Sequence, residues 1–409
     1  MSDAADLPRT VSAASLRVES SPAWNRLPTV GSLMAAVGLL GSLAIGLGGN
    51  AAAQTQLWHS WLVAALFVLT IALGGMFFVL IHHATQAGWS VTVRRIAENA
   101  MAAIPFIALL FVPLLFVLSE LFPWSRAAEV AHDPLLAHKA ALLNTPFFVG
   151  RTVVYFLLWS AIAIWFNSLS RRQDDDGDQE ITRRMRRASP PALIVFALTV
   201  TFASFDWLMS LDAHWYSTIF GVYFFAGCLV GIYAFMSLVA IGQRRAGLLP
   251  GVVTTEHVNL LGMLLFGFVA FWAYIGFSQY LLIWYANLPE ETGFFAMRLA
   301  GSWRPITIGL VLGHFIVPFF FLMPRTIKRN STALAVGAAW MLLMHALDLH
   351  WLVMPILHPE GFTPALVDVT TMIGAVGLFL AAFGRASRRQ ALVPVRDPRL
   401  TESLLFDNI

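Results

Sequence analysis

The sequence predicts an all-α protein that crosses a membrane about ten times. Hydrophobic residues make up 58% of the chain, and the mean hydropathy is +0.71. Charged residues account for only 12%, about half of the roughly 25% that is usual for soluble domains. Apolar stretches long enough to span a bilayer as a helix, about 20 residues each, recur along the whole chain. These observations predict a polytopic integral membrane protein whose helices pack in bundles.

Ten such stretches follow one another. We expect the spans at 28–48, 57–81, 96–120, 147–168, 190–212, 217–242, 257–286, 303–323, 332–354 and 367–384. The first 27 residues are polar and do not open with a short basic leader, so we expect the first helix to be kept in the mature protein. The chain then divides into an N-terminal segment (1–27), a membrane domain (28–384) and a C-terminal tail (385–409).

Two connections are long enough to matter. Segment 169–189 is strongly polar and separates spans one to four from spans five to ten; we expect a solvated linker. Segment 121–146, on the opposite side of the membrane, is longer than a turn, and we expect a short surface helix there.

The basic residues predict the orientation. Of the 26 lysines and arginines, 21 lie in segments that an even number of spans places on one side. By the positive-inside rule, this side is cytoplasmic, so both termini are predicted to be cytoplasmic. The net charge of +3 follows from this asymmetry, and a nucleic-acid surface is not needed to explain it.

Several chemistries lack the residues they require. Cys228 is the single cysteine, which excludes disulfides, Cys-ligated clusters and covalently attached haem within this chain. Walker-type glycine loops, HExxH and GxSxG are absent from the sequence, so nucleotide hydrolysis and the common hydrolase mechanisms have no support.

The polar side chains inside the spans are the candidate functional residues. Asp206 lies near the outer end of span five, and Arg151 enters span four from the same side, so we expect a structural ion pair between them. His345 and Asp348 are three residues apart and share a helical face, where the carboxylate can orient the imidazole. Arranged by depth, the series resembles a proton relay. Its members are Glu98, His257, His314, His345, Asp348, Asp206, Gln279 and Glu120.

Two alternatives remain open for these residues. Each side chain can simply satisfy a neighbouring helix. His314 and His345, on successive spans, can also hold one haem between two imidazoles as in b-type cytochromes. The usual pattern of two separated histidines on each of two helices is absent, so no metal site is assigned.

Three stretches resemble one family closely: DPLLAHKAALLNTPFFVGRTVVYFLLW (133–159), SFDWLMSLDAHWYSTIFGVYFFAG (204–227) and FSQYLLIWYANLPEET (277–292). They are similar to the ActF family, the second NrfD-like (polysulfide-reductase-like) membrane subunits of bacterial alternative complex III. The resemblance extends from about span one to span ten.

This resemblance implies a subunit of a quinol:electron-acceptor oxidoreductase in the bacterial cytoplasmic membrane. The implied partners are a sister NrfD-like subunit (ActC), an iron–sulfur subunit, c-type haem subunits, small membrane-anchored subunits, lipids and a terminal oxidase. Haem c, iron–sulfur clusters and quinol are then expected in those partners, and no cofactor is assigned to this chain. Within such a complex the chain is expected to conduct or couple protons without catalysing the redox step itself. A second quinol-binding subunit, a purely structural anchor, a stand-alone transporter and a b-type cytochrome are the alternatives.

Overall fold

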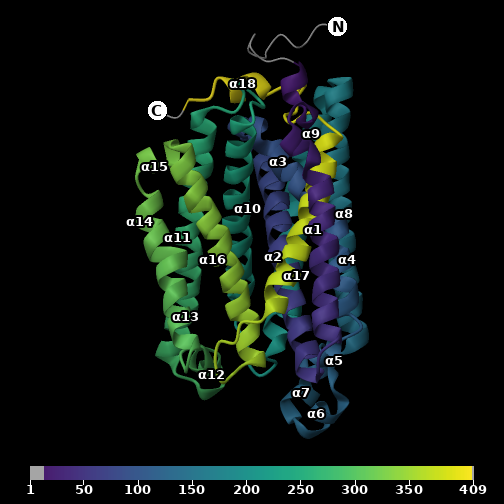
Figure 1. Cartoon of the computed structure of the whole chain (residues 1–409), viewed down its shortest axis with the longest axis vertical. Helices are drawn as coiled ribbons and strands as arrows, with labels where there is room; N and C mark the ends of the chain where they lie inside the picture. The colour runs from purple at the N-terminus through teal and green to yellow at the C-terminus, as the bar shows by residue number, and fades with distance from the viewer. Residues whose placement is uncertain (1–12, 408–409) are drawn as a thin grey trace.

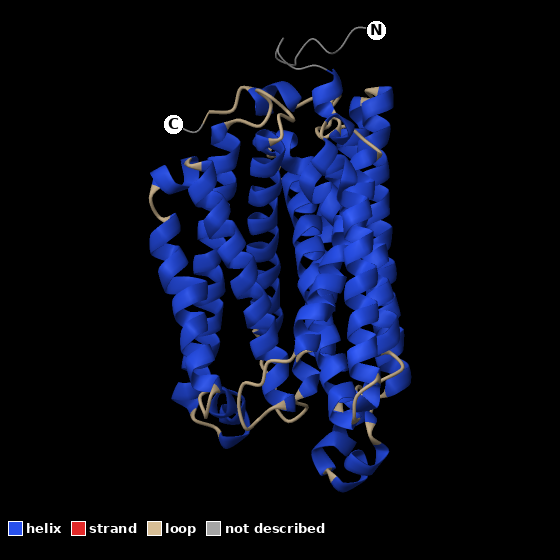
Figure 2. Cartoon of the chain, viewed as in Figure 1, coloured by secondary structure: helices blue, strands red, loops and turns tan. Residues whose placement is uncertain are grey.

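The computed structural model describes residues 13–407, so the first twelve residues of the predicted N-terminal segment and residues 408–409 lie outside the described part. Within this range the chain is helical, with no strand, and ten helical segments are long and apolar enough to cross a membrane (Figure 2). This confirms an all-α, multi-pass membrane protein.

The ten spans are these: α1 (Pro22–Leu47), α2 (Ala51–Ala84), α3 with α4 (Val91–Met101 and Ile104–Leu114), α8 (Thr145–Asp176), α9 (Gln179–Trp207), α10 (Phe220–Arg245), α11 (Thr255–Ala286), α13 with η6 and α14 (Trp303–Leu310, Val311–Ile316 and Val317–Leu322), α16 (Ser331–Leu357) and α17 (Leu366–Arg388). Short helices fill the connections: η1 (Ala13–Leu16), η2 (Val18–Ser20), η3 (Gly88–Ser90), α5 (Leu118–Leu121), η4 (Pro123–Ser125), α6 (Ala127–His132), α7 (Pro134–Lys139), η5 (Met209–Leu211), α12 (Pro289–Arg298), α15 (Arg325–Arg329) and α18 (Leu400–Leu404).

The spans form two groups that meet at the middle of the molecule. One group contains α2, α3, α4, α8 and α9, with α1 and α17 packed beside α2; the other contains α10, α11, α13–α14 and α16 (Figure 1). The helices α2 and α10 pack against each other and are buried along most of their length. Polar groups on these two helices are therefore enclosed by protein, where a membrane protein must satisfy them internally.

Large apolar side chains cover the outside of the bundle. Leu33, Leu157, Phe202, Phe277 and Phe320 are each more than half exposed, and they lie on five different spans. A soluble monomer does not expose so many apolar side chains. The surface is the one that lipid tails would cover.

The helices α1 and α17 approach closely because small residues line both. A Cβ built on Gly31 would lie 2.5 Å from the backbone nitrogen of Ala381, and one on Gly38 would overlap the backbone of Gly374. Such small-residue seams let helix backbones touch where the hydrophobic effect no longer drives association.

The third span differs from its predicted bounds of 96–120. It begins at Gly88 and ends at Leu114, because Arg94 and Arg95 are neutralised inside the protein and can belong to the span. Glu120, predicted at the end of this span, instead lies on the short helix α5.

The two long connections are both helical. Segment 169–189 is not an extended linker, since α8 continues to Asp176 and α9 begins at Gln179, with a left-handed turn at Gly177 (φ 67°) between them. The connection 121–146 contains α6 and α7, as the prediction of a surface helix requires.

Both termini of the described chain lie at the same end of the bundle (Figure 1). The lysines and arginines predict that this end is cytoplasmic; we call it the inner end, and the opposite end the outer end. After α17, the segment 389–405 crosses the inner end and finishes in α18.

Candidate functional site

A cluster of polar side chains lies where α2, α10, α11, η6 and α16 meet. Its members are all buried, and we call them the central polar cluster: Thr70, Tyr223, Trp272, His314, His345 and Asp348. One spacing in the sequence and the packing of two neighbouring helices create it. His345 and Asp348 face the same way on α16, and Tyr223 on α10 and Trp272 on α11 close the cluster from neighbouring helices.

Asp348 is held by two donors. The Tyr223 hydroxyl donates to Oδ1 at 2.5 Å, and the Trp272 indole nitrogen donates to Oδ2 at 3.2 Å. The residue is only 2% exposed, and no lysine or arginine is bonded to its carboxyl group in the described chain. Its hydrogen bonds therefore come from neutral groups, so Asp348 is not locked into a salt bridge and can exchange a proton.

His345 is held from α2 and not by Asp348. Its Nε2 lies 2.8 Å from the hydroxyl oxygen of Thr70, while its Nδ1 has no hydrogen-bond partner in the described protein. Two glycines on α10 make room for the ring. A Cβ on Gly227 would lie 2.9 Å from Cε1 of the imidazole, and one on Gly231 would lie 3.4 Å from Cδ2. The direct imidazole–carboxylate contact expected from the spacing is replaced by two separate sets of hydrogen bonds.

His314 lies in an irregular part of its span. Residues Val311–Ile316 form a π-helix, and Pro318 follows four residues after His314. Because proline has no amide hydrogen, it cannot donate the α-helical bond to the His314 carbonyl. Single π turns often occur at functional sites. The imidazole stacks on Trp272 with ring centroids 3.8 Å apart, and neither ring nitrogen has a hydrogen-bond partner in the described protein.

The two imidazoles and the carboxylate of the cluster converge. One ligand atom from each of His314, His345 and Asp348 lies within 4.8 Å of the other two. A single water with hydrogen bonds of about 2.8 Å can connect polar atoms roughly 5 Å apart. The set can therefore exchange protons through water, or hold a small cation with two imidazoles and one carboxylate. The unpartnered nitrogens of both histidines are available for either role.

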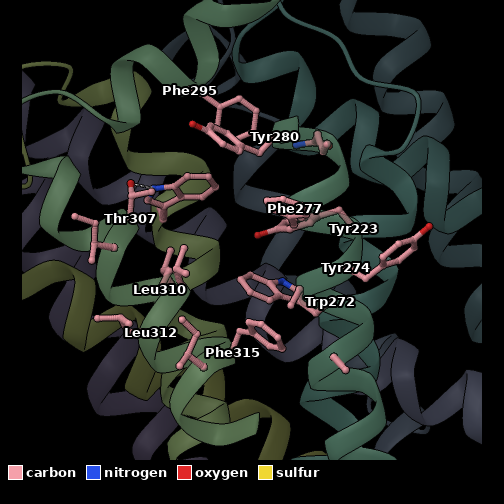
Figure 3. Close-up of a pocket in the computed structure, with 18 of the residues that line it drawn as sticks. Tyr223, Trp272, Tyr274, Phe277, Tyr280, Phe295, Thr307, Leu310, Leu312 and Phe315 are labelled. Carbon is pink, nitrogen blue, oxygen red and sulfur yellow. Dashed lines mark hydrogen bonds between the residues drawn. The ribbon is translucent and has the colours of Figure 1, made fainter. Parts of the chain in front are cut away.

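An apolar cleft adjoins the cluster from the lipid side. It has a volume of about 600 Å³ and lies between α11 and the segment α13–η6 (Figure 3). Tyr223 and Trp272 belong both to the cluster and to the wall of the cleft, and Gln279 and Thr307 add polar groups. Tyr274, Phe277, Ile308 and Val311 are more than 40% exposed, so the cleft opens laterally.

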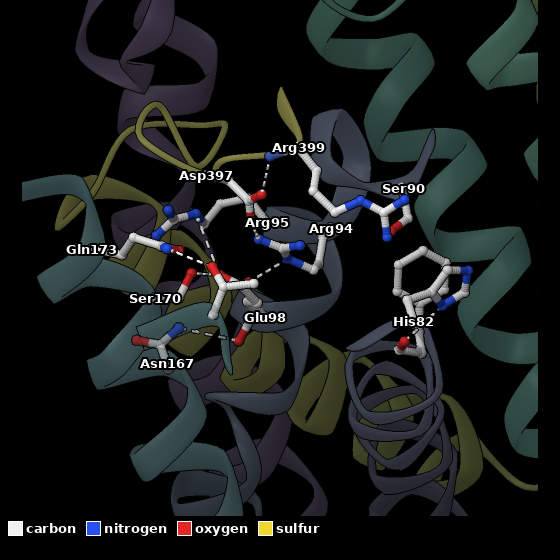
Figure 4. Close-up of polar contacts among 12 residues, drawn as sticks. His82, Ser90, Arg94, Arg95, Glu98, Asn167, Ser170, Gln173, Asp397 and Arg399 are labelled. Carbon is white, nitrogen blue, oxygen red and sulfur yellow. Dashed lines mark hydrogen bonds and ion pairs between the residues drawn. The ribbon is translucent and has the colours of Figure 1, made fainter. Parts of the chain in front are cut away.

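Glu98, the innermost relay candidate, lies elsewhere in an ionic network (Figure 4). Its carboxylate is bonded to Arg94 at 3.1 Å, to Arg95 at 3.3 Å and to the Ser170 hydroxyl at 2.8 Å. None of these partners belongs to the central polar cluster. The position of Glu98 is therefore explained by two structural ion pairs.

His257 also has a structural position. Its Nδ1 contacts Thr254 at the start of α11, and its Nε2 lies 3.0 Å from the backbone carbonyl of Ser403. The ring caps α11 and fastens α18 to it. The structure does not bring His257 to the other relay candidates.

The ion pair expected between Arg151 and Asp206 is present. Arg151 donates from Nε at 2.8 Å and from Nη2 at 2.6 Å to the two carboxylate oxygens. The Tyr155 hydroxyl donates to the same carboxylate at 2.7 Å. With three donors, Asp206 is a partner of Arg151 rather than a relay group.

The two remaining candidates lie toward the outer end. Gln279 accepts a hydrogen bond from the Ser217 hydroxyl at 3.1 Å and lines the apolar cleft. Glu120 accepts from the Thr55 hydroxyl at 2.9 Å. Near them, Asp368 accepts from Gln56 at 2.8 Å and from Ser60 at 2.5 Å, and His358 contacts Gln56 at 2.5 Å. This outer polar network was not anticipated from the sequence.

Thr70, Tyr223 and Trp272 were also missed as cluster members. Each lies within an apolar span, where a lone polar or aromatic residue gives little signal. The span α2 contains several other polar residues, among them Gln56, His59 and Ser60, so Thr70 does not stand out in the sequence. The rotation of each helix about its own axis depends on how the spans pack, and the sequence does not show this packing.

No family model matches the sequence, and no curated protein matches it either.

Proposed function

We propose that this chain is the ActF-like membrane subunit of a quinol:electron-acceptor oxidoreductase of the alternative complex III type. Its role is to conduct or couple protons while partner subunits oxidise quinol. The family part of this proposal rests on the three sequence stretches at 133–159, 204–227 and 277–292. The proton part rests on the central polar cluster.

The observation that carries the proton role is the buried meeting of His314, His345 and Asp348. A carboxylate without a cationic partner and two histidines with free ring nitrogens lie within 4.8 Å of one another. Intramembrane ionisable groups are costly and usually functional. Ion pairs explain Asp206 and Glu98, but they do not explain these three residues.

A change of Asp348 to Asn tests this role. The amide keeps the shape and can still accept from Tyr223, but it cannot titrate. In the assembled complex, reconstituted in vesicles, we expect quinol oxidation to continue while turnover-linked proton movement falls severalfold. The exposed carboxylate Asp407 supplies the matched control as Asp407→Asn. Unchanged proton movement in Asp348→Asn would contradict the proposal.

The partners can be tested separately. A tag on the full-length chain, purified in mild detergent, should bring haem c and iron–sulfur subunits with it, measurable by absorption spectra and mass spectrometry. Purification of a stable lone protein with its own transport activity would favour a transporter instead.

The apolar cleft favours a second candidate function, binding of a quinone in this chain. The cleft opens toward lipid and ends at Tyr223, whose hydroxyl reaches Asp348. An apolar pocket with a few converging polar groups is the usual form of such a site. Replacing Ile308, a half-exposed lining residue, with Trp would fill the cleft. Loss of quinone binding in Ile308→Trp would support this function. Unaltered binding would leave the proton role as the only candidate function.

A further inference from the structure

A second cavity, at the inner end of the first helix group, is lined by positively charged side chains. Its volume is about 200 Å³, and it lies between the inner ends of α2, α3 and α9 and the C-terminal segment. Four arginines line it, and they face a single carboxylate, Asp397. These arginines are Arg94, Arg183, Arg186 and Arg399.

The lining charges are only partly matched. Arg94 is paired with Asp397 at 2.5 Å and with Glu98 at 3.1 Å, and Arg399 is paired with Glu402 at 2.7 Å. Arg183 shares Glu180 with Arg187, at 3.2 and 3.6 Å. Arg186 forms no ion pair within the described residues and is exposed toward the cavity mouth. The excess positive charge of the lining therefore lies on α9, at Arg183 and Arg186.

Two buried nitrogen atoms in the lining lack hydrogen-bond partners in the described protein. His83 is only 4% exposed, and its Nε2 has no hydrogen-bond partner in the described protein. Nη1 of Arg399 is buried and unpartnered as well. Buried polar groups are normally satisfied. A cavity with this charge and these nitrogen atoms favours a negatively charged ligand with several acceptor oxygens. A phosphate group has both properties.

The position of the cavity fits phosphates at a membrane surface. Arg186 lies one helical turn before Pro190, where the apolar part of α9 begins. The predicted cytoplasmic leaflet carries anionic lipids, which attract basic residues at this level. A cavity of about 200 Å³ equals the volume of roughly seven waters in the liquid, enough for one phosphate and its hydration.

We propose that this cavity binds a phosphate group, presented by an anionic phospholipid headgroup or by a soluble phosphate. Arg183 and Arg186 contact it from α9, and His83 and Arg399 donate from the floor and from the C-terminal segment. The bound group then links α2 and α9 to the segment 389–405. This site is independent of the proton role proposed above.

The competing explanation is that the arginines of α9 act only as topology anchors. The helix itself provides the control, because Arg184 and Arg187 are exposed, carry the same charge and do not line the cavity. The cavity variant is therefore Arg183→Gln with Arg186→Gln, and the control variant is Arg184→Gln with Arg187→Gln. All four side chains are on the surface, so both variants should fold.

The full-length protein, with any subunits that accompany it, is reconstituted in nanodiscs of phosphatidylcholine with or without phosphatidylglycerol. Retained lipid is measured by native mass spectrometry, and inorganic phosphate is added separately in a thermal-shift assay. We expect the cavity variant to lose retention of phosphatidylglycerol by about tenfold or more, because two charge-assisted contacts are removed. The control variant should resemble the unmodified protein.

The outcomes separate the sources of the phosphate. Selective retention of phosphatidylglycerol assigns the site to a lipid headgroup. Stabilisation by inorganic phosphate, without selective lipid retention and lost only in the cavity variant, assigns it to a soluble phosphate. If neither probe binds the unmodified protein, or if both variants lose binding equally, the proposal is wrong.

Discussion

At the scale of single residues, the ion pair of Arg151 and Asp206 illustrates how a charge is kept at lipid depth. The side chains are 14% and 7% exposed, so the pair is largely buried but keeps some exposed surface. Replacing Asp206 with Asn should destabilise the protein by up to about 3–5 kcal/mol, because Arg151 is left without a charged partner. A double change, Arg151→Met with Asp206→Leu, should recover much of the loss. Thermal unfolding in detergent measures both. Equal losses in the single and double variants would show that the ion pair itself is stabilising.

The glycines of α10 give a second prediction for single residues. Gly231→Ala would place a methyl group 3.3 Å from the Ile71 side chain and 3.4 Å from the His345 ring. The ring must then shift by a few tenths of an ångström, which weakens its hydrogen bond to Thr70. We expect about 1–3 kcal/mol of destabilisation, as for other overpacked sites, together with reduced proton movement. Gly267→Ala, where a new Cβ would meet nothing within 4 Å, is the control. Identical proton movement in the two variants would argue against a role for the position of His345.

The sequence predicted part of the central polar cluster for a physical reason. His345 and Asp348 share a face through helical spacing alone, and His314 was placed near mid-membrane by counting residues. Glu98 and His257 were included on depth alone, but depth does not tell which neighbours a side chain meets. Glu98 meets two arginines, and His257 meets the α18 backbone. Tyr223 and Trp272 depend on how α10 and α11 are rotated, which only the packed bundle determines.

At the scale of helices, the seam between α1 and α17 is set by small residues. Gly38 on α1 faces the backbone of Gly374, whereas Gly41, three residues later, faces open space. Gly38→Ala should push the two helices apart and destabilise the protein by about 1–3 kcal/mol or more. Gly41→Ala should be neutral or slightly stabilising, because alanine favours helix. Unfolding midpoints in the same detergent compare the two. Equal midpoints would mean that the seam tolerates separation.

Helix existence was predictable, but helix ends were less so. The ten spans follow from apolar runs longer than the bilayer requires. The start of the third span was predicted too late in the chain because Arg94 and Arg95 interrupt the apolar run. Their partners, Asp397 and Asp174, come from distant parts of the chain. Segment 169–189 was predicted as a linker from its charge, yet its residues favour helix and continue α8 and α9 beyond the apolar run.

At the scale of the whole molecule, the C-terminal segment holds the inner end together. Asp397 bonds Arg94, Ser403 bonds Thr92, and Gln390 bonds Asn99. Burial alone would raise the pKa of Asp397, but the charge and the hydrogen bond of Arg94, together with the backbone hydrogen bond from Arg399, outweigh it and hold this pKa below its usual value. The contact is therefore stabilising above the pKa of an unfolded aspartate, about 3.9, and is lost as the pH falls through the lower folded value.

Removing this charge should loosen the segment at neutral pH. Asp397→Asn leaves Arg94 with Glu98 as its remaining partner, so we expect limited proteolysis within 389–405 to become severalfold faster. Asp407→Asn, at an exposed site, is the control. Gel analysis of the cleavage products follows both. A cleavage rate that does not differ between Asp397→Asn and the control would mean that other contacts suffice to hold the segment.

The orientation of the whole bundle gives the final prediction. Asp178 lies in the turn between α8 and α9 at the inner end, and Lys139 ends α7 at the outer end. Cys228 is the single cysteine and is buried, so it should contribute little background in thiol labelling. A membrane-impermeant maleimide should therefore label Asp178→Cys only in inside-out vesicles, and Lys139→Cys only in intact cells or spheroplasts. The reverse pattern would invert the bundle and place the phosphate cavity on the outer face. Labelling of both sites from one side would contradict the crossing of the membrane by α8, because this single span separates the two turns.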